Sequence, residues 1–416
     1  MIAMILIILK LLIILCVVAT IHEFGHFLMC KLFKVGVNEF SIGFGPKIFQ
    51  KKIKETMYSL RWIPLGGYCA IEGEGEESNS SGSFNNVNVL KKILILCMGV
   101  VFNAILAVII FVSIAFSVPT FNTKITGFVN DSITEQAGLK VGDTIYAIDG
   151  KKVNISADLI QRRINGKNVE VQYIRDGQMH KANVENAVTD IGYIGVSFNL
   201  SDDKKSVTNV VNMVASGGAA VKAGLKANDK ILSINGISTP NSTSVIEIVK
   251  QNANKELEFL IDRKGEIVTK KVIPEIKAYF DLQIASTEKV KTNFKLAFIS
   301  AWSNVKTIVG SYCDLFTGKV GFKDMSGIVG IGEVVSNTDG TRNFLNLIGI
   351  ISLAIGVANI MPFPPLDGGK IVIVTIEAIT RKKVPIKVES IISYIGFGLL
   401  LLLTIYVTFN DLIRIL

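Results

Sequence analysis

Four long apolar runs set the limits on what this chain can fold into. They cover residues 2–21, Ile93–Val118, Phe344–Phe363 and Ile391–Phe409. A helix needs about 20 apolar residues to cross the hydrocarbon core of a bilayer, so each run is long enough to do so. Hydrophobic residues make up 49% of the 416 residues and charged residues only 19%. The sequence therefore predicts a membrane protein with a four-transmembrane-helix α-helical core.

The first run is where a cleaved signal peptide would lie. A signal peptide has a basic leading segment and a small-residue cleavage site. The run lacks the first, and no such site precedes His22. We therefore expect this run to remain in the chain as a transmembrane helix.

Basic residues gather in the two loops that follow the first and third runs. The positive-inside rule places such loops in the cytoplasm, so both chain ends and the long middle section fall outside. Topology thus explains much of the net charge of +9, and we expect no nucleic acid partner. The residues are Lys34, Lys47, Lys51, Lys52, Lys54, Arg61, Lys91 and Lys92 in one loop, and Arg381, Lys382, Lys383 and Lys387 in the other.

The middle section contains an internal repeat. The segment AGLKVGDTIYAIDG at Ala137–Gly150 returns as AGLKANDKILSING at Ala223–Gly236. Each copy reads as a turn, a short apolar strand, a second turn, a helical stretch and alternating strands. The copies resemble PDZ domains of bacterial proteases. This likeness implies either capture of a peptide in a strand–helix groove or a folded spacer that limits access by size, and the sequence leaves both open.

Two histidines and a glutamate stand at the end of the first apolar run, in HEFGH at His22–His26. One helical turn separates His22 from His26, so both can bind one metal ion from the same helix face. Glu23 lies beside them and can take a proton from metal-bound water. Ionisable groups are costly at membrane depth and usually serve a function there. The alternative interpretation is a pair of interfacial histidines beside a glutamate that reaches toward water.

A catalytic zinc ion usually has three protein ligands and one open position, so a third ligand must come from elsewhere. His180 is the last of three histidines, and its strand-like context predicts an ordinary surface residue. The better candidate is Asp367, in NIMPFPPLDGGK at the end of the third run. Prolines and a Gly-Gly pair break the helix there. The predicted topology puts Asp367 on the same side as His26, which favours a ligand over a simple Asp-Gly turn.

This combination resembles the site-2 proteases, intramembrane zinc metalloproteases, of the bacterial type with tandem PDZ domains. That group includes enzymes that cleave membrane-bound anti-sigma factors. The resemblance rests on HEFGH, NIMPFPPLDGG, the twin repeats and SIGFGP after the first run. It implies that His22, His26 and Asp367 hold Zn²⁺ and that Glu23 is the general base. It also implies that Asn359 contacts the substrate backbone.

The sequence predicts five parts. Residues 1–118 hold transmembrane helices 1 and 2, HEFGH and a cytoplasmic or re-entrant β segment of hairpins. By the resemblance this segment dips into the membrane, and the alternative is a plain cytoplasmic hairpin. Residues 119–187 and 189–274 are two inserted α+β PDZ-like domains. Residues 275–342 form an amphipathic connecting segment, either on the outer membrane surface or packed on the bundle. Residues 343–416 hold transmembrane helices 3 and 4 with the Asp367 ligand.

We therefore expect a multi-pass zinc endopeptidase of the bacterial plasma membrane. Its active site lies near the cytoplasmic side and its PDZ-like domains lie outside. It would cleave the transmembrane segments of single-span proteins in regulated intramembrane proteolysis, with an anti-sigma factor or remnant signal peptides as substrates. The alternative is a membrane-anchored PDZ scaffold with a non-catalytic metal site. A zinc-dependent transporter is less favoured, because four spans with one metal triad offer no visible translocation path. The sequence leaves the oligomeric state open.

Overall fold

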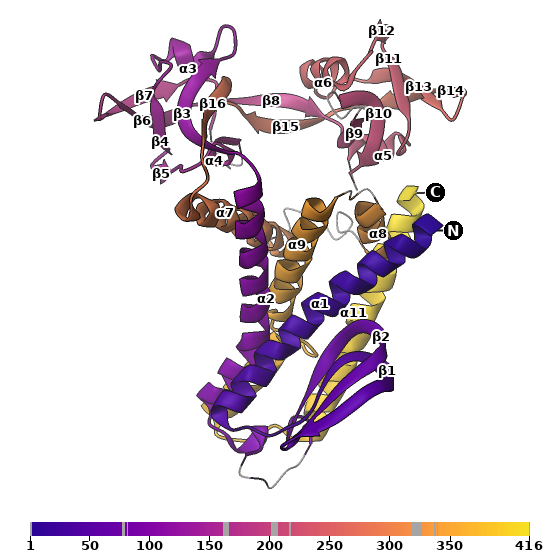
Figure 1. The fold of residues 1–416 in the computed structure, drawn as a ribbon. Coiled ribbons are helices and arrows are strands. Elements are labelled where there is room, and N and C mark those ends of the chain that lie inside the picture. The colour runs from indigo at the N-terminus through magenta and orange to yellow at the C-terminus, as the bar shows by residue number, and fades with distance from the viewer. Residues whose placement is uncertain are drawn as a thin grey trace. The chain divides into compact units, whose positions relative to one another are not determined.

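A computed structural model describes residues 2–76, 80, 82–160, 166–200, 207–215, 218–317, 327–336, 338 and 340–415. Their contacts divide the chain into two units (Figure 1). We call the first, Met1–Val118, Ser300–Val320 and Ser326–Thr408, the membrane unit. We call the second the repeat unit, and it consists chiefly of Pro119–Ile299.

Four helices of the described chain are long and apolar enough to cross a membrane, as the sequence predicts. The helices are α1 (Ile2–Phe33), α2 (Val89–Ser117), α9 (Thr341–Asn359) and α11 (Ile386–Ile415). Much of their apolar surface is not covered by protein, and the side chains of Leu6, Ile109 and Leu402 are more than half exposed. Large exposed apolar surface of this kind fits contact with lipid rather than water.

The core of the membrane unit forms where α2 meets α1, α9 and α10 (Asp367–Thr380). On one side, Ile14 and Val18 of α1 pack against Val335 of α8 (Ile328–Ser336) and against α9. On another, Val305 of α7 (Phe294–Phe316) packs against α2 and α9. The C-terminal part of α7 therefore packs on the bundle, which was one of the two placements left open by its amphipathic pattern.

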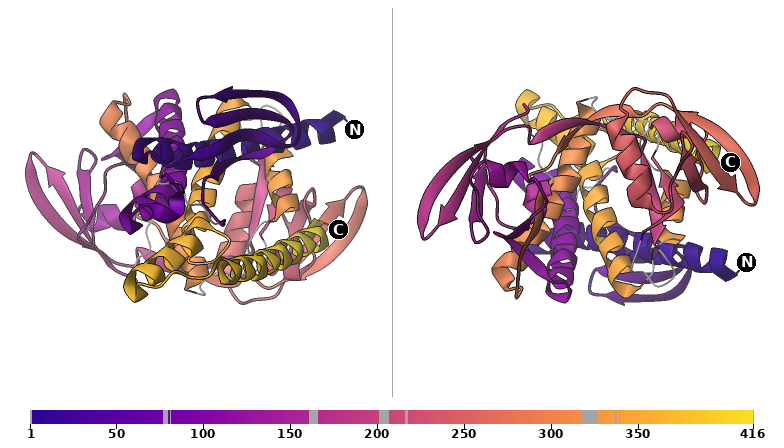
Figure 2. Two further views of the ribbon diagram at one scale, coloured as in Figure 1. Left: turned by 90° about the horizontal axis from the view of Figure 1, so that it is seen from below. Right: turned by 90° about the horizontal axis from the view of Figure 1, so that it is seen from above.

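A β-hairpin follows α1 directly and lies alongside it (Figures 1 and 2). Its strands are β1 (Val37–Ile53) and β2 (Thr56–Ile71), with repeated register shifts between them. Residues 67–71 of β2 are paired with the start of β1 beside the histidine-bearing end of α1. Farther out, Phe49 and Trp62 are exposed apolar side chains. The predicted hairpin is therefore present, with its inner end close to HEFGH.

The repeat unit contains two antiparallel sheets with matching strand order, as the internal repeat in the sequence predicts. Each has its own apolar core, built around Ile145 and Val171 in the first repeat and around Ile231 and Phe259 in the second. The first sheet has the strand order β16-β3-β4-β6-β7, with β5 on β4. The second has the order β14-β13-β11-β10-β9, with β12 on β11.

The strands of the first sheet are β3 (Thr120–Phe128), β4 (Thr144–Ile148), β5 (Lys151–Lys152), β6 (Val169–Arg175), β7 (Gln178–Val184) and β16 (Ile284–Val290). Those of the second are β9 (Val196–Leu200), β10 (Val207–Val214), β11 (Lys230–Ile234), β12 (Ile237–Ser238), β13 (Leu257–Arg263) and β14 (Glu266–Val272). Short helices α3 (Ile133–Gln136) and α4 (Ala157–Ile160) accompany the first sheet, and α5 (Ala219–Lys222) and α6 (Ser242–Gln251) accompany the second.

The boundaries of the first repeat differ from those drawn from the sequence. Strand β16 completes the first sheet, although it follows the second repeat in the chain. Strands β8 (Val188–Tyr193) and β15 (Glu275–Phe280) pair with each other and connect the two sheets. Residues 275–290 therefore belong to the repeat unit and not to a connecting segment. A strand pattern indicates that a strand exists, but it does not indicate which sheet the strand joins.

Candidate metal centre

The side chains of His22, His26 and Asp367 converge in the membrane unit. The Nε2 atoms of the two histidines are 3.2 Å apart, because one turn of α1 brings both rings to the same helix face. Oδ2 of Asp367, the first residue of α10, lies 2.9 Å from Nε2 of His22 and 3.4 Å from Nε2 of His26. Both histidines are buried. The structure thus brings together all three side chains predicted as ligands, although 345 positions separate His22 from Asp367.

Two glycines allow this approach. A Cβ atom added at Gly99 of α2 would lie 2.6 Å from Cε1 of His22 and 2.6 Å from Nε2 of His26. A Cβ at Gly25 would collide with the carbonyl oxygen of Met98. Gly25 of HEFGH therefore lets α1 and α2 cross closely, and Gly99 leaves room for the two imidazoles.

The break between α9 and α10 places Asp367. Helix α9 ends at Asn359 and α10 begins at Asp367, with the proline-rich turn between them. Cβ atoms at Gly368 and Gly369 would collide with the backbone of that turn, at Ile360 and Pro364 respectively. The two glycines therefore let the first turn of α10 pack directly on the proline-rich segment, with Asp367 at its N-terminal end.

Backbone and side-chain contacts orient the two imidazoles. Nδ1 of His26 lies 2.8 Å from the carbonyl oxygen of Ile95, to which its N–H can donate. That hydrogen bond leaves the lone pair of Nε2 directed at the centre, as a metal ligand requires. Nδ2 of Asn359 lies 3.4 Å from Nε2 of His22. The amide for which the resemblance implies a substrate contact thus lies beside the ligand cluster.

Asn103 of α2 is a site residue that sequence reasoning missed. It is fully buried, its Nδ2 lies 3.5 Å from Nδ1 of His22, and its Oδ1 has no hydrogen-bond partner. Turning the amide about χ2 would place Oδ1 where it accepts the N–H of Nδ1, which leaves Nε2 of His22 free to bind a metal ion. A polar residue inside the apolar run Ile93–Val118 was the available signal.

Glu23 is held by the β-hairpin. Its Oε2 accepts a hydrogen bond of 3.0 Å from the backbone N–H of Cys69 on β2. The glycines before Cys69 bring the strand close, since a Cβ at Gly66 would lie 3.1 Å from Ala19 of α1. The candidate base is therefore held by the β-hairpin, whereas the candidate ligand Asp367 is held by α10.

The donor set fits a zinc ion. Ligands at about 2.0–2.1 Å from a tetrahedral zinc lie about 3.3 Å from one another. The three separations of 2.9, 3.2 and 3.4 Å agree with that spacing. Two imidazoles and one carboxylate are also donors that zinc commonly takes. The third histidine, His180, lies on β7 of the repeat unit and stacks on Tyr173, so it is not one of the three grouped ligand residues.

Four membrane-length helices and a cluster of two histidines and an aspartate fit a membrane-embedded metalloprotein, and the sequence is similar to those of known metallopeptidases. The family model described as Peptidase family M50 matches residues 10–403. Regulator of sigma-W protease RasP of Bacillus subtilis is 28% identical over 414 residues, covering 95% of each chain. Zinc metalloprotease RasP of Bacillus licheniformis is 28% identical over 413 residues, covering 95% of this chain and 96% of the relative. The PDZ domain of HtrA3 matches 22% of this chain and 92% of its own, at 17% identity and a TM-score of 0.19.

The chain belongs to peptidase family M50, the site-2 protease family. It is a zinc metalloprotease, and the prediction of an intramembrane zinc endopeptidase that acts in regulated proteolysis is confirmed. The prediction of Zn²⁺ as the cofactor is confirmed as well.

Proposed function

We propose that His22, His26 and Asp367 hold the catalytic zinc ion and that Glu23 is the general base for peptide hydrolysis within the membrane. The observation that carries this assignment is the convergence of three ligand atoms to within 3.4 Å, two of them from the C-terminal half of the membrane helix α1. Glu23 neighbours His22 in the sequence and is anchored by Cys69.

A zinc ion held there by His22, His26 and Asp367 would supply the Lewis acid that polarises a water molecule and the scissile carbonyl group. The carboxylate of Glu23 accepts the water proton and later delivers it to the leaving amine. The hydrogen bond from Cys69 keeps one carboxylate oxygen in place, which leaves the other oxygen available for the proton. The carbonyl oxygen of Ile95 holds the Nδ1 proton of His26, which fixes the tautomer whose Nε2 lone pair faces the centre. Asn359 can donate its amide N–H groups to a substrate carbonyl beside the cluster.

We propose that substrates are single-span membrane proteins that bind as an extended strand along residues 67–71 of β2. A helical peptide bond is shielded by its own hydrogen bonding, so a substrate must unwind before it is cut. A strand edge beside Glu23 offers the backbone partners that an unwound segment needs. The exposed Phe49 and Trp62 suit a hairpin in contact with lipid. One relative is named as a regulator of sigma-W protease, which favours a membrane-bound anti-sigma factor as the substrate class.

The distribution of basic residues supports the sidedness of the chain. With the loops around Lys34 and Lys382 in the cytoplasm, the metal centre lies near the cytoplasmic face of the bacterial plasma membrane. The repeat unit then lies outside. In the second repeat, an apolar groove runs between β9 and α6, lined by Ile194, Phe198 and Val245. This groove favours a peptide-binding role for that repeat, and the alternative function as a membrane-anchored scaffold would use the same surface.

Replacing Glu23 with Gln separates the enzyme from the scaffold. Gln keeps the size of the side chain and an oxygen for the Cys69 N–H, so the variant should fold and retain zinc. It lacks the base, so cleavage of a single-span substrate by the purified full chain in detergent should fall by about 10²-fold or more. Zinc content and thermal unfolding serve as controls. Wild-type cleavage by Glu23→Gln would overturn the assignment.

A further inference from the structure

An ion pair joins the element that carries Asp367 to the segment that follows the strand holding Glu23. Nζ of Lys370 lies 2.6 Å from Oε1 of Glu74, across 296 positions of sequence. The two side chains are only 31% and 20% exposed, so this contact is sheltered from water. Partly buried pairs are screened less than surface pairs and can restrain geometry.

Lys370 is tied to the metal ligand through one helical turn. It lies three positions after Asp367 on α10, and the two side chains therefore share a helix face. The glycines between them press that turn against the backbone of the proline-rich segment. A rotation or shift of the first turn of α10 would move Lys370 and Asp367 together.

Glu74 is tied to the base through β2. It lies five positions after Cys69, and a short series of backbone hydrogen bonds fixes the segment between them. The N–H of Glu74 donates to the carbonyl oxygen of Ile71, and the N–H of Glu72 donates to that of Gly36, in the link between α1 and β1. The position of Glu74 therefore follows that of the strand whose Cys69 N–H binds Glu23.

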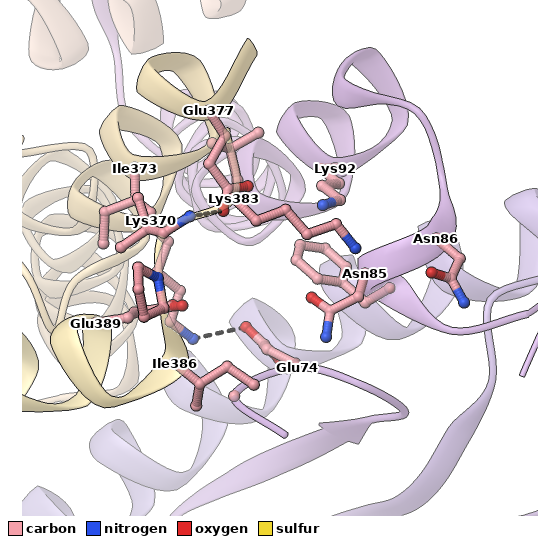
Figure 3. A pocket seen from close by; sticks show the side chains of 15 residues that line it. Glu74, Asn85, Asn86, Lys92, Lys370, Ile373, Glu377, Lys383, Ile386 and Glu389 are labelled. Carbon is pink, nitrogen blue, oxygen red and sulfur yellow. Dashed lines mark hydrogen bonds and ion pairs between the residues drawn. The ribbon is translucent and has the colours of Figure 1, made fainter. Parts of the chain in front are cut away.

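The pair lies in the wall of a polar pocket of about 360 Å³ (Figure 3). Two other carboxylates face the same pocket, Glu377 on α10 and Glu389 on α11. Oε1 of Glu377 already accepts the N–H of Val384 at 2.8 Å. Lys92 also lines the pocket and is buried, with the ring of Phe84 5.7 Å from its Nζ. Lys370 thus has other acidic groups near it but is hydrogen-bonded to Glu74.

We propose that Glu74 and Lys370 are positioning residues that set the distance between Glu23 and the Asp367 ligand. This inference rests on the proposed roles of Glu23 and Asp367. Without the pair, α10 and β2 are joined less firmly across the centre. The base then spends less time in the geometry needed for proton transfer, and Asp367 holds the metal less firmly. Substrate contacts made by the edge of β2 remain.

The test compares single and paired substitutions in the purified full chain with a single-span substrate. Glu74→Gln and Lys370→Met should each lower kcat by about 10-fold, because small misplacements of catalytic groups are costly. KM should change less than twofold. Zinc release to a chelator should become several-fold faster. The double variant should be no worse than either single variant, because both remove the same contact.

Rescue separates positioning from general damage to the fold. Lys370→Arg keeps the charge and should retain most of kcat, and the exchange Glu74→Lys with Lys370→Glu should recover part of it. A matched control is Glu55→Gln, which breaks the Lys31–Glu55 pair of 2.7 Å between α1 and the hairpin turn, where the carboxylate side chain is 64% exposed. It should leave kcat and zinc release unchanged.

Three results would overturn the proposal: wild-type kcat in both single variants, a change in KM alone, or a loss of kcat explained entirely by a smaller folded fraction. Glu23→Gln is run alongside. If it is inactive while Glu74→Gln and Lys370→Met match the wild type, the positioning role fails and the proposed function stands. If Glu23→Gln is active, the proposed function itself fails.

Discussion

Both units of this protein bury aspartate side chains, but they surround them with different partners. In the repeats, Asp143 and Asp229 are almost fully buried and occupy equivalent places. Each binds one arginine through two contacts of 2.7–2.8 Å, Arg175 in the first repeat and Arg263 in the second. Each also accepts a backbone N–H three positions before it. At the metal centre, Asp367 forms its described ion pairs with His22 and His26 alone.

The difference follows from the cost of burying charge. A buried carboxylate needs a compensating positive group and hydrogen bonds to satisfy its oxygens. In the repeats the arginine supplies both the positive charge and hydrogen bonds. The aspartate of the repeated AGLK-x-x-D motif therefore stabilises the fold of each repeat. At the metal centre, neutral imidazoles carry no permanent positive charge to balance Asp367. A bound cation would supply that charge. The same residue type thus serves as a structural group in one unit and as a ligand in the other.

The largest loss of cleavage activity should come from a substitution that crowds the metal centre. Ala at Gly99 would favour the helix by about 1 kcal/mol through its intrinsic propensity. Its methyl group would lie 2.6 Å from atoms of both imidazoles, so the rings must move and the donor spacing is lost. Gly99→Ala should therefore reduce cleavage by about 10²-fold or more, since distorted donors hold the metal poorly. Cleavage assays and zinc analysis of the purified chain measure this.

Gly398→Ala in α11 is the matched control, because a Cβ at that position meets nothing within 4 Å. It should leave zinc content and cleavage at wild-type values. Equal loss in both variants would show that any added methyl group disturbs these helices, and the steric explanation for Gly99 would then be wrong.

A substitution at a buried aspartate of the repeats should have a smaller effect, on thermal stability and not on zinc binding. Asp143→Asn removes the charge that pairs with Arg175, so the repeat unit should unfold at a temperature several degrees lower. Zinc content should not change. Limited proteolysis of the full chain during heating reports on the repeat unit, and Asp176→Asn, at an exposed position, is the control. Loss of zinc in Asp143→Asn would show that the structural aspartates of the repeats and the ligand Asp367 do not have separate roles.

The pH dependence of the stability of the repeat unit also tests whether Asp143 has a structural role. Burial alone would raise the pKa of Asp143, but hydrogen bonds from Arg175 and from the backbone N–H of Lys140 outweigh it and lower that pKa. Because the folded state has the lower pKa, the stabilisation is complete above the ordinary aspartate value of about 4 and is lost as pH falls through the folded-state pKa. Below pH about 4, the wild-type repeat unit should lose stability faster than Asp143→Asn, measured by thermal unfolding at stepwise pH.

Much of this architecture could be predicted from local sequence patterns. The apolar runs gave the four spans, the spacing of His22 and His26 gave the paired ligands, and the broken third run pointed to Asp367. These features depend on helix periodicity and length, which act over a few residues. The repeat was visible for the same reason, because similarity at a fixed interval needs no knowledge of packing.

The remainder depends on contacts between distant segments. Nothing near Gly99 in the sequence reveals that two imidazoles pack against it, and the Asn103 amide becomes a histidine partner only once α1 and α2 cross. The Glu74–Lys370 pair joins positions far apart along the chain. The place of β16 in the first sheet likewise follows from pairing with β3, which strand propensity does not specify.

The assignment of Asp367 as the third ligand is the central claim, and metal analysis tests it most directly. Wild-type protein and Asp367→Ala are purified in detergent, dialysed against a mild chelator and analysed for zinc per chain. Two histidines alone hold zinc poorly. The wild type should therefore retain about one zinc ion per chain, as one three-ligand site requires. Asp367→Ala should lose it while the repeat unit stays folded. Full zinc occupancy in Asp367→Ala would contradict the account, because another residue would then have to be the ligand.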